Sequence, residues 1–203
     1  MALQSNPYLV WQLVPAVLTL LIGLTIQVRG ANRHGSRVFT LLMYAGSLWA
    51  FASAIQLVSP NPSWQRLWNG VLYTAVMVIP TAWLLVAVRI TGLARGLLDR
   101  VGPWIWAPPA FFYLANVTTS VHRLFFTGYS MVGSDRFFAL EHGFGPIFLV
   151  HTAYSYLLLL GGVVIILLWV VQNYRDDAAR AVPLVLGVLA PLVGNAWFLF
   201  GNV

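Results

Sequence analysis

Six long apolar stretches constrain the fold of this chain more than any other feature. A membrane-spanning α-helix needs roughly 20 mostly apolar residues, and only helices and closed barrels satisfy their backbone hydrogen bonds in lipid. A barrel would alternate in polarity over about 10 residues, whereas residues 157–171 are one unbroken apolar run. The sequence therefore predicts an all-α membrane protein, a single domain (residues 1–203) built as a bundle of six transmembrane helices. The predicted spans are Tyr8–Val28, Val38–Leu57, Leu67–Val88, Val101–Val117, Gly145–Val171 and Ala181–Phe200.

The basic residues, all of them arginines, orient the predicted bundle. Eight of the eleven lie in three alternate connections between spans, and three lie elsewhere. Cytoplasmic loops carry an excess of Arg and Lys. We therefore expect a multi-pass protein of the plasma (inner) membrane, with the arginine-rich connections in the cytoplasm and the N-terminus outside. The arginine-rich connections hold Arg29, Arg33, Arg37, Arg89, Arg95, Arg100, Arg175 and Arg180, and the others hold Arg66, Arg123 and Arg136.

Composition excludes several classes of protein. With 60% hydrophobic and 8% charged residues, the chain does not read as a water-soluble domain. The net charge of +6 is spread over short turns that lack an aromatic platform on which bases could stack. Membrane topology and contact with anionic lipid headgroups therefore explain the charge better than nucleic-acid binding does. The absence of cysteine excludes disulfides and thiolate chemistry.

The connection Thr118–Phe144 differs from the others because it mixes aromatic and polar residues without a helical period. Runs of strand-forming aromatics flank Gly133-Ser134-Asp135, a pattern typical of a β-hairpin with a glycine-containing turn. We predict an extracellular hairpin that covers the bundle between helices four and five. The alternative is an irregular loop packed on the bundle through its aromatics.

Residues for catalysis are scarce. No lysine is present for a retinal Schiff base, the four histidines show no metalloprotease spacing, and the five acids all lie between the spans. The two halves of the chain also lack the repeat that marks many transporters. The sequence therefore predicts no enzyme activity, no metal site and no cofactor.

Polar side chains that enter the membrane cost free energy unless they find partners or a wet cavity. In the deduced topology these side chains come from helices two to six at similar depths, which predicts a ligand pocket open to the outside. Trp49 and Trp83 lie deeper, and either could form the floor of the pocket or simply pack in the core. The predicted lining residues are Gln56, Tyr73, Asn116, His151, Tyr154 and Asn195.

Each of these residues also has a structural interpretation. Gln56 and Asn116 could cap helix ends at the interface, and Asn195 could join two helices by a hydrogen bond. His151 forms one polar helix face with Tyr154 and Ser155. It is either a ligand contact or a packed structural histidine.

A series of short motifs, in order, resembles the N-terminal seven-transmembrane sensor region of bacterial and archaeal histidine kinases. The most specific motif is the Gly-Pro…His…Tyr-Ser-Tyr block within residues 145–162. Gln56 departs from the resemblance because such sensors often have an acid there, and the chain stops before a seventh helix. The residues that carry the resemblance are Arg37, Phe39, Leu48, Trp49, Pro80, Trp83, Thr91, Gly92, Asn116, His122, Gly145, Pro146, His151, Tyr154, Ser155, Tyr156, Tyr174, Arg175, Leu186, Gly187, Pro191 and Asn195.

The resemblance implies a signal-sensing module of a two-component system. Such a module binds an extracellular or membrane-borne ligand, either a small molecule or a lipid, and relays helix rearrangement to a cytoplasmic kinase or another output domain. Membrane lipids are the other expected partners, homodimerisation is left open, and nucleic acid is not expected. The alternative functions are a small transporter or channel, and a membrane subunit that only anchors a partner.

Overall fold

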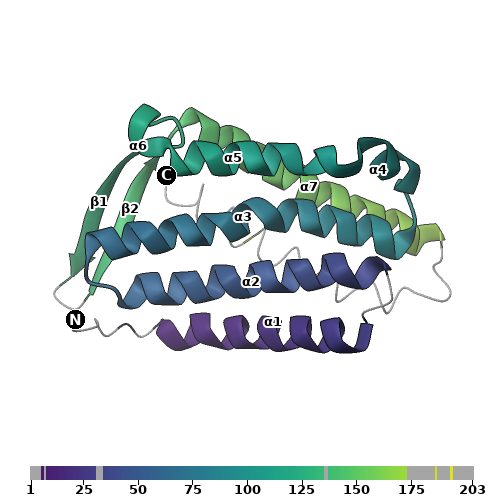
Figure 1. Cartoon of the computed structure of the whole chain (residues 1–203), viewed down its shortest axis with the longest axis horizontal. Coiled ribbons are helices and arrows are strands. Elements are labelled where there is room, and N and C mark those ends of the chain that lie inside the picture. The colour runs from purple at the N-terminus through teal and green to yellow at the C-terminus, as the bar shows by residue number, and fades with distance from the viewer. Residues whose placement is uncertain are drawn as a thin grey trace.

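The computed structural model describes residue 6, residues 8–30, 34–134 and 137–172, and the single residues 186 and 193. Helices α1 (Leu9–Gly30), α2 (His34–Val58) and α3 (Pro62–Thr91) lie side by side in one row (Figure 1). Beyond α3, helices α5 (Ala107–Val117) and α7 (Pro146–Gln172) both contact it (Figure 1). The chain is therefore organised around α3, which has neighbours on both sides.

Four of the described helices are long and apolar enough to cross a membrane: α1, α2, α3 and α7. They correspond to the first, second, third and fifth predicted spans. Helices α2 and α3 extend beyond their predicted limits at both ends, whereas α1 and α7 begin one residue later than predicted and end slightly later. Helix α3 begins at Pro62 instead of Leu67, because the Asn61 side chain accepts a hydrogen bond from the Ser63 amide (2.8 Å) and caps the helix. The sixth predicted span, Ala181–Phe200, lies outside the described residues, apart from Leu186 and Val193.

The fourth predicted span, Val101–Val117, is helical throughout but is not one continuous α-helix, and it is not among the four helices long enough to cross a membrane. Val101 ends a short helix, α4 (Arg95–Val101), a 3-10 helix η1 (Gly102–Trp106) follows, and only the eleven residues of α5 are α-helical. Prolines explain the break, since Pro103 lies in η1 and Pro108 and Pro109 occupy the first turn of α5, where no backbone N–H is needed. Apolar length alone did not reveal this change of helix type.

The predicted β-hairpin is confirmed. Strands β1 (Phe126–Ser134) and β2 (Phe137–Phe144) pair antiparallel at one end of the bundle (Figure 1). Their residues alternate in exposure, so that one face packs inward and the other faces outward. The half-buried inward face consists of Tyr129, Met131, Leu140 and His142.

The base of the hairpin is tied to the helices on both sides of it. The Gly145 amide donates to the Phe125 carbonyl (2.9 Å), and the Ile147 amide donates to the Leu124 carbonyl (2.9 Å). On the other side, the Thr119 hydroxyl of the short helix α6 (Thr119–His122) accepts from the Phe126 amide (2.9 Å). The hairpin therefore begins and ends at fixed points on the bundle.

The described arginines divide between the two ends of the bundle. Arg29 and Arg89 lie in the last turns of α1 and α3, Arg37 lies near the start of α2, and α4 carries Arg95 and Arg100. These positions are at the end opposite the hairpin (Figure 1). Arg66, near the start of α3, and Arg123, just before β1, lie at the hairpin end. The other four arginines lie outside the described residues: Arg33, Arg136, Arg175 and Arg180.

Two side-chain hydrogen bonds join α3 to α7 within the apolar part of the bundle. The Trp83 indole N–H donates to the Leu159 carbonyl (3.1 Å), and the hydroxyls of Thr81 and Tyr154 lie 3.2 Å apart. The helices approach closely here because Gly162 has no side chain to separate them from Trp83. A buried cluster of Trp83, Ala87, Val163 and Ile166 completes this interface.

Candidate functional site

The hairpin end of the bundle is filled by one buried cluster of mainly aromatic side chains, termed here the hairpin-end cluster. It draws residues from α3, α5, α7 and the start of the hairpin. Phe125 and Phe126 lie at its centre, with 0% and 1% of their surface exposed. Its members are Tyr73, Met77, Phe112, Ala115, Phe125, Phe126 and Phe148.

Edge-to-face ring contacts hold the hairpin-end cluster together. The Tyr73 and Phe126 ring centres lie 5.1 Å apart, and those of Phe125 and Phe126 lie 4.9 Å apart. At the start of α7, Phe148 stacks on Phe144 of β2 with ring centres at 4.1 Å. Aromatic pairs in such geometries are worth about 0.5–1.5 kcal/mol beyond the area they bury. The hairpin and the first turn of α7 are therefore one packed unit.

Three of the predicted pocket residues, Tyr73, His151 and Tyr154, meet at this cluster. His151 is buried, its ring centre lies 5.0 Å from that of Phe112, and its Nε2 lies 3.3 Å from the Ser155 hydroxyl. Tyr154 also packs on Phe112, with ring centres at 5.5 Å. Tyr73 is a member of the cluster, and Asn116 is buried near the end of α5, one residue from Ala115.

Trp83, Trp49 and Gln56 are not part of this cluster. Trp83 belongs to the separate α3–α7 cluster, ten residues or about 15 Å along α3 from Tyr73. Trp49 is 46% exposed on α2, and Gln56 is half-buried on the same helix. Asn195 lies outside the described residues. The ligand-binding roles of all eight predicted pocket residues stay predictions.

His142 on β2 was not among the predicted site residues, yet it lies between the hairpin and α3. Its ring centre is 4.3 Å from that of Phe126 and 6.2 Å from that of Tyr73. Its Nδ1 is buried and has no hydrogen-bond partner among the described residues. Burial lowers the pKa of His142 to about 4 from its ordinary value of 6.5, because the apolar surroundings disfavour the charged ring.

Tyr129, which pairs with His142 across the strands, faces a cation. The Arg66 guanidinium carbon lies 5.2 Å from the centre of the Tyr129 ring. Burial raises the pKa of the Tyr129 hydroxyl, and the nearby Arg66 offsets part of that rise. Tyr129 is therefore a neutral partner to His142 across the physiological range.

Gln65 is a second functional residue that the sequence did not reveal. It is fully buried, and its Nε2 donates both to the Ser59 carbonyl (2.6 Å) and to the Phe138 carbonyl of β2 (3.0 Å). One amide therefore joins the α2–α3 turn, the start of α3 and the hairpin. Buried hydrogen-bonded groups of this kind typically cost about 1–3 kcal/mol when one partner is removed.

Local patterns could have indicated His142 but not Gln65. Leu140, His142 and Phe144 alternate with Ala139, Glu141 and Gly143, which is the pattern of a strand with one buried face. Gln65 lies in a polar stretch before an apolar run, where an exposed position is the ordinary expectation. Its burial depends on the hairpin, which comes from a distant part of the chain.

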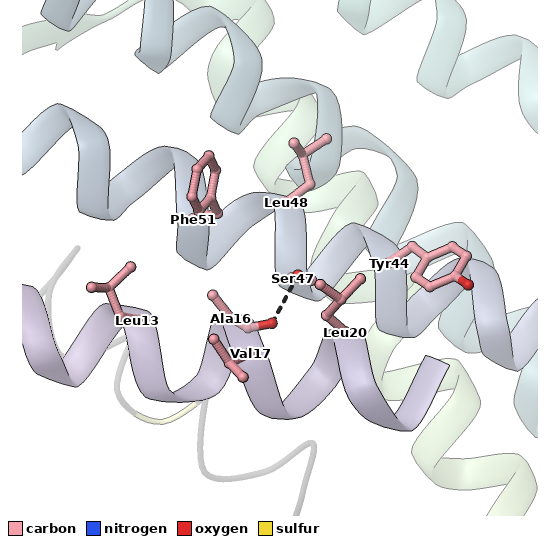
Figure 2. Close-up of a pocket in the computed structure, with 8 residues that line it drawn as sticks. All are labelled: Leu13, Ala16, Val17, Leu20, Tyr44, Ser47, Leu48 and Phe51. Carbon is pink, nitrogen blue, oxygen red and sulfur yellow. Dashed lines mark hydrogen bonds between the residues drawn. The ribbon is translucent and has the colours of Figure 1, made fainter. Parts of the chain in front are cut away.

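A groove between α1 and α2, with a volume of about 550 Å³, lies apart from the predicted pocket (Figure 2). No predicted pocket residue lines it, and its walls are apolar except for Tyr44 and Ser47. The Ser47 hydroxyl donates to the Ala16 carbonyl across the groove (2.8 Å; Figure 2). The groove lining consists of Leu13, Ala16, Val17, Leu20, Tyr44, Ser47, Leu48 and Phe51.

Within the described residues, no group of three or more His, Asp and Glu side chains gathers as a metal site would require. Membrane-length helices with a β-hairpin packed on one end define a multi-pass helical membrane protein. Residues 12–203 match the family model described as the N-terminal 7TM region of histidine kinase, and the chain belongs to this family. Comparison with curated proteins and with solved structures gives no match. The family model covers the membrane region, so any kinase domain lies outside it.

Proposed function

We propose that the chain is the sensing module of a two-component histidine kinase and that the hairpin end of the bundle receives the signal. The ligand is a small molecule or lipid that reaches Tyr73, Asn116, His151 and Tyr154, and the module relays a change in helix packing to the kinase output domain. One observation carries the proposal: the hairpin and α7 share one aromatic cluster. A change in the hairpin therefore acts directly on α7.

The relay would follow α7 through the membrane. Phe148 contacts the hairpin, and His151 and Tyr154 lie one and two turns further along α7. Beyond them, the bonds from Tyr154 to Thr81 and from Trp83 to Leu159 couple α7 to α3. A ligand shifts this arrangement only by binding one packing state more tightly than the other.

The orientation is also part of the proposal, with the hairpin outside and α4 in the cytoplasm. The chain has no cysteine, so single introduced cysteines report accessibility without background. We expect a membrane-impermeant maleimide to label Ser130→Cys in intact cells and to label Gly96→Cys only after permeabilisation. Both positions are exposed, on β1 and α4. The reverse pattern would place the hairpin in the cytoplasm and contradict the orientation.

His151→Phe tests the signalling role. It keeps an aromatic ring of similar size but removes the hydrogen bond to Ser155. We expect the basal autophosphorylation of the full-length kinase in membranes to change several-fold, because the sensor's balance of states is altered, while thermal stability changes little. The control is Tyr113→Phe, at a position 38% exposed on α5, which should leave both properties unchanged.

The same variant separates a sensing from a structural histidine. If His151→Phe lowers the melting temperature and leaves autophosphorylation per folded molecule at the wild-type level, the residue only stabilises the bundle. Solute flux through vesicles holding the wild-type protein would instead favour the transporter alternative.

A further inference from the structure

His142 combines three properties that the proposed relay does not use. First, it lies at the interface between the hairpin and α3. Second, four aromatic rings surround its own ring, with centre-to-centre distances of 4.3 Å to Phe126, 5.4 Å to Phe144, 6.2 Å to Tyr73 and 6.3 Å to Tyr129. Third, its Nδ1 is buried without a hydrogen-bond partner among the described residues. A neutral imidazole packs in such a site as an aromatic ring. An imidazolium carries N–H groups on both nitrogens, so its Nδ1–H would be buried without an acceptor.

The charged groups around His142 do not favour its protonated form. Arg66 of α3 lies over the Tyr129 ring, whose centre is 6.3 Å from that of His142, and it would repel a second positive charge. Glu141, the carboxylate on the described part of the hairpin, is exposed on the opposite face of β2. Tyr73 and Tyr129 are neutral. The half of α2 that contacts β2 contains no charged residue. From α7, the uncharged Phe148 stacks on Phe144 of β2. Attraction of an imidazolium to the ring faces offsets only part of the cost of burial.

We infer that the proton is a signal for this sensor and that His142 is the proton-binding site: neutral His142 holds the hairpin against α3, and protonation releases the hairpin from the bundle. This inference rests on the proposed sensing function and adds the proton, bound at a separate residue, to the signals that the module receives. Release is a pivot and not a detachment, because the Gly145–Phe125 and Ile147–Leu124 bonds tie the base of the hairpin. The Gln65–Phe138 bond opposes the movement and favours the closed state at neutral pH.

Proton linkage gives the direction and size of the effect. The pKa of His142 is about 4 in the closed hairpin and returns towards 6.5 when the ring is hydrated. The open form therefore binds more protons between these values, and the closed form loses stability as pH falls through 6.5 towards 4. From these two values, the opening equilibrium constant rises about 30-fold between pH 7.5 and pH 5.

The test places spin labels at Ser120→Cys on α6 and Ser130→Cys on β1 of the full-length protein in lipid nanodiscs. Both positions are exposed, and the natural chain has no other cysteine within the 203 residues. We expect one short distance at pH 7.5 and a second, longer population at pH 5. His142→Phe and His142→Gln, which cannot become cationic, should remain closed at both pH values. The control His122→Gln, on α6, should keep the wild-type response.

Two results would overturn the inference: a distance distribution that is the same at pH 7.5 and pH 5, or a pH response that persists in both His142 variants. Either would leave the proposed sensing function standing with another ligand. If the hairpin opens at pH 5 as expected but autophosphorylation of the same nanodisc sample does not change with pH, the proposed relay to the kinase is contradicted. The pH-dependent opening of the hairpin at His142 would then still hold. The two proposals are therefore distinguished by one sample and two readouts.

Discussion

Gly162→Ala is expected to lower the thermal stability of the protein, whereas Gly161→Ala is not. A Cβ at position 162 would lie 2.8 Å from Trp83 Cδ1 and would overlap the indole nitrogen. Trp83 is 5% exposed and bonded to Leu159, so it has little freedom to move. Overpacking of this kind typically costs about 1–3 kcal/mol, which we expect as a fall of several degrees in the melting temperature.

Gly161 provides a matched control for this prediction. It is the adjacent residue of the same helix, and the substitution adds the same methyl group. A Cβ there would meet its nearest neighbour, Leu84 Cδ1, at 3.8 Å, an ordinary van der Waals distance. Tryptophan fluorescence during thermal unfolding in detergent measures both variants. Equal melting temperatures would show that α3 and α7 are not in the close contact described here.

Gly145→Ala is expected to disrupt the base of the hairpin. An added Cβ would lie 2.6 Å from the Leu124 carbonyl carbon and would overlap the carbonyl oxygen. Backbone cannot move aside as a side chain can, so the Gly145–Phe125 and Ile147–Leu124 hydrogen bonds must lengthen or break. We expect a loss of stability of a few kcal/mol, since several hydrogen bonds and the packing of Phe148 depend on this contact.

Limited proteolysis of the hairpin measures that effect directly, because cleavage follows local opening. Gly128→Ala is the control: it lies in the same hairpin, and an added Cβ there meets no atom within 4 Å. We expect rapid cleavage of Gly145→Ala and wild-type cleavage of Gly128→Ala. A protease-resistant Gly145→Ala variant would contradict the described junction between hairpin and α7.

Apolar length made four membrane helices predictable, and the turn residues with their flanking aromatics made the hairpin predictable. Both signals are local, and lipid imposes strict limits on what an apolar run can become. The 3-10 segment within Val101–Val117 was not predicted, because the length of the span was counted while Pro103, Pro108 and Pro109, which change the local helix type, were not weighed.

The candidate site was predictable only in part, for a geometric reason. Depth along each helix follows approximately from residue number, and Tyr73, His151 and Tyr154 do meet at one aromatic cluster. Their role in ligand binding stays a prediction. Which way a helix face points depends on partners far away in the sequence. Trp49 is 46% exposed, and Gln65 is buried with its side-chain amide bonded to the Phe138 carbonyl of β2.

The hydrogen-bonded base of the hairpin fixes how the hairpin joins the bundle in this protein, independently of the strands that follow it. Backbone hydrogen bonds at residues 124–125 and 145–147 set the spacing between the helices that flank the hairpin, whatever lies between them. The outward strand faces are exposed, and the far ends of the paired strands, at Ser134 and Phe137, lie remote from that junction. Evolution could therefore exchange the strands for others of different length or chemistry without rebuilding the bundle. The same junction offers an insertion point at which a foreign recognition hairpin could be grafted to give one transmembrane scaffold a new input.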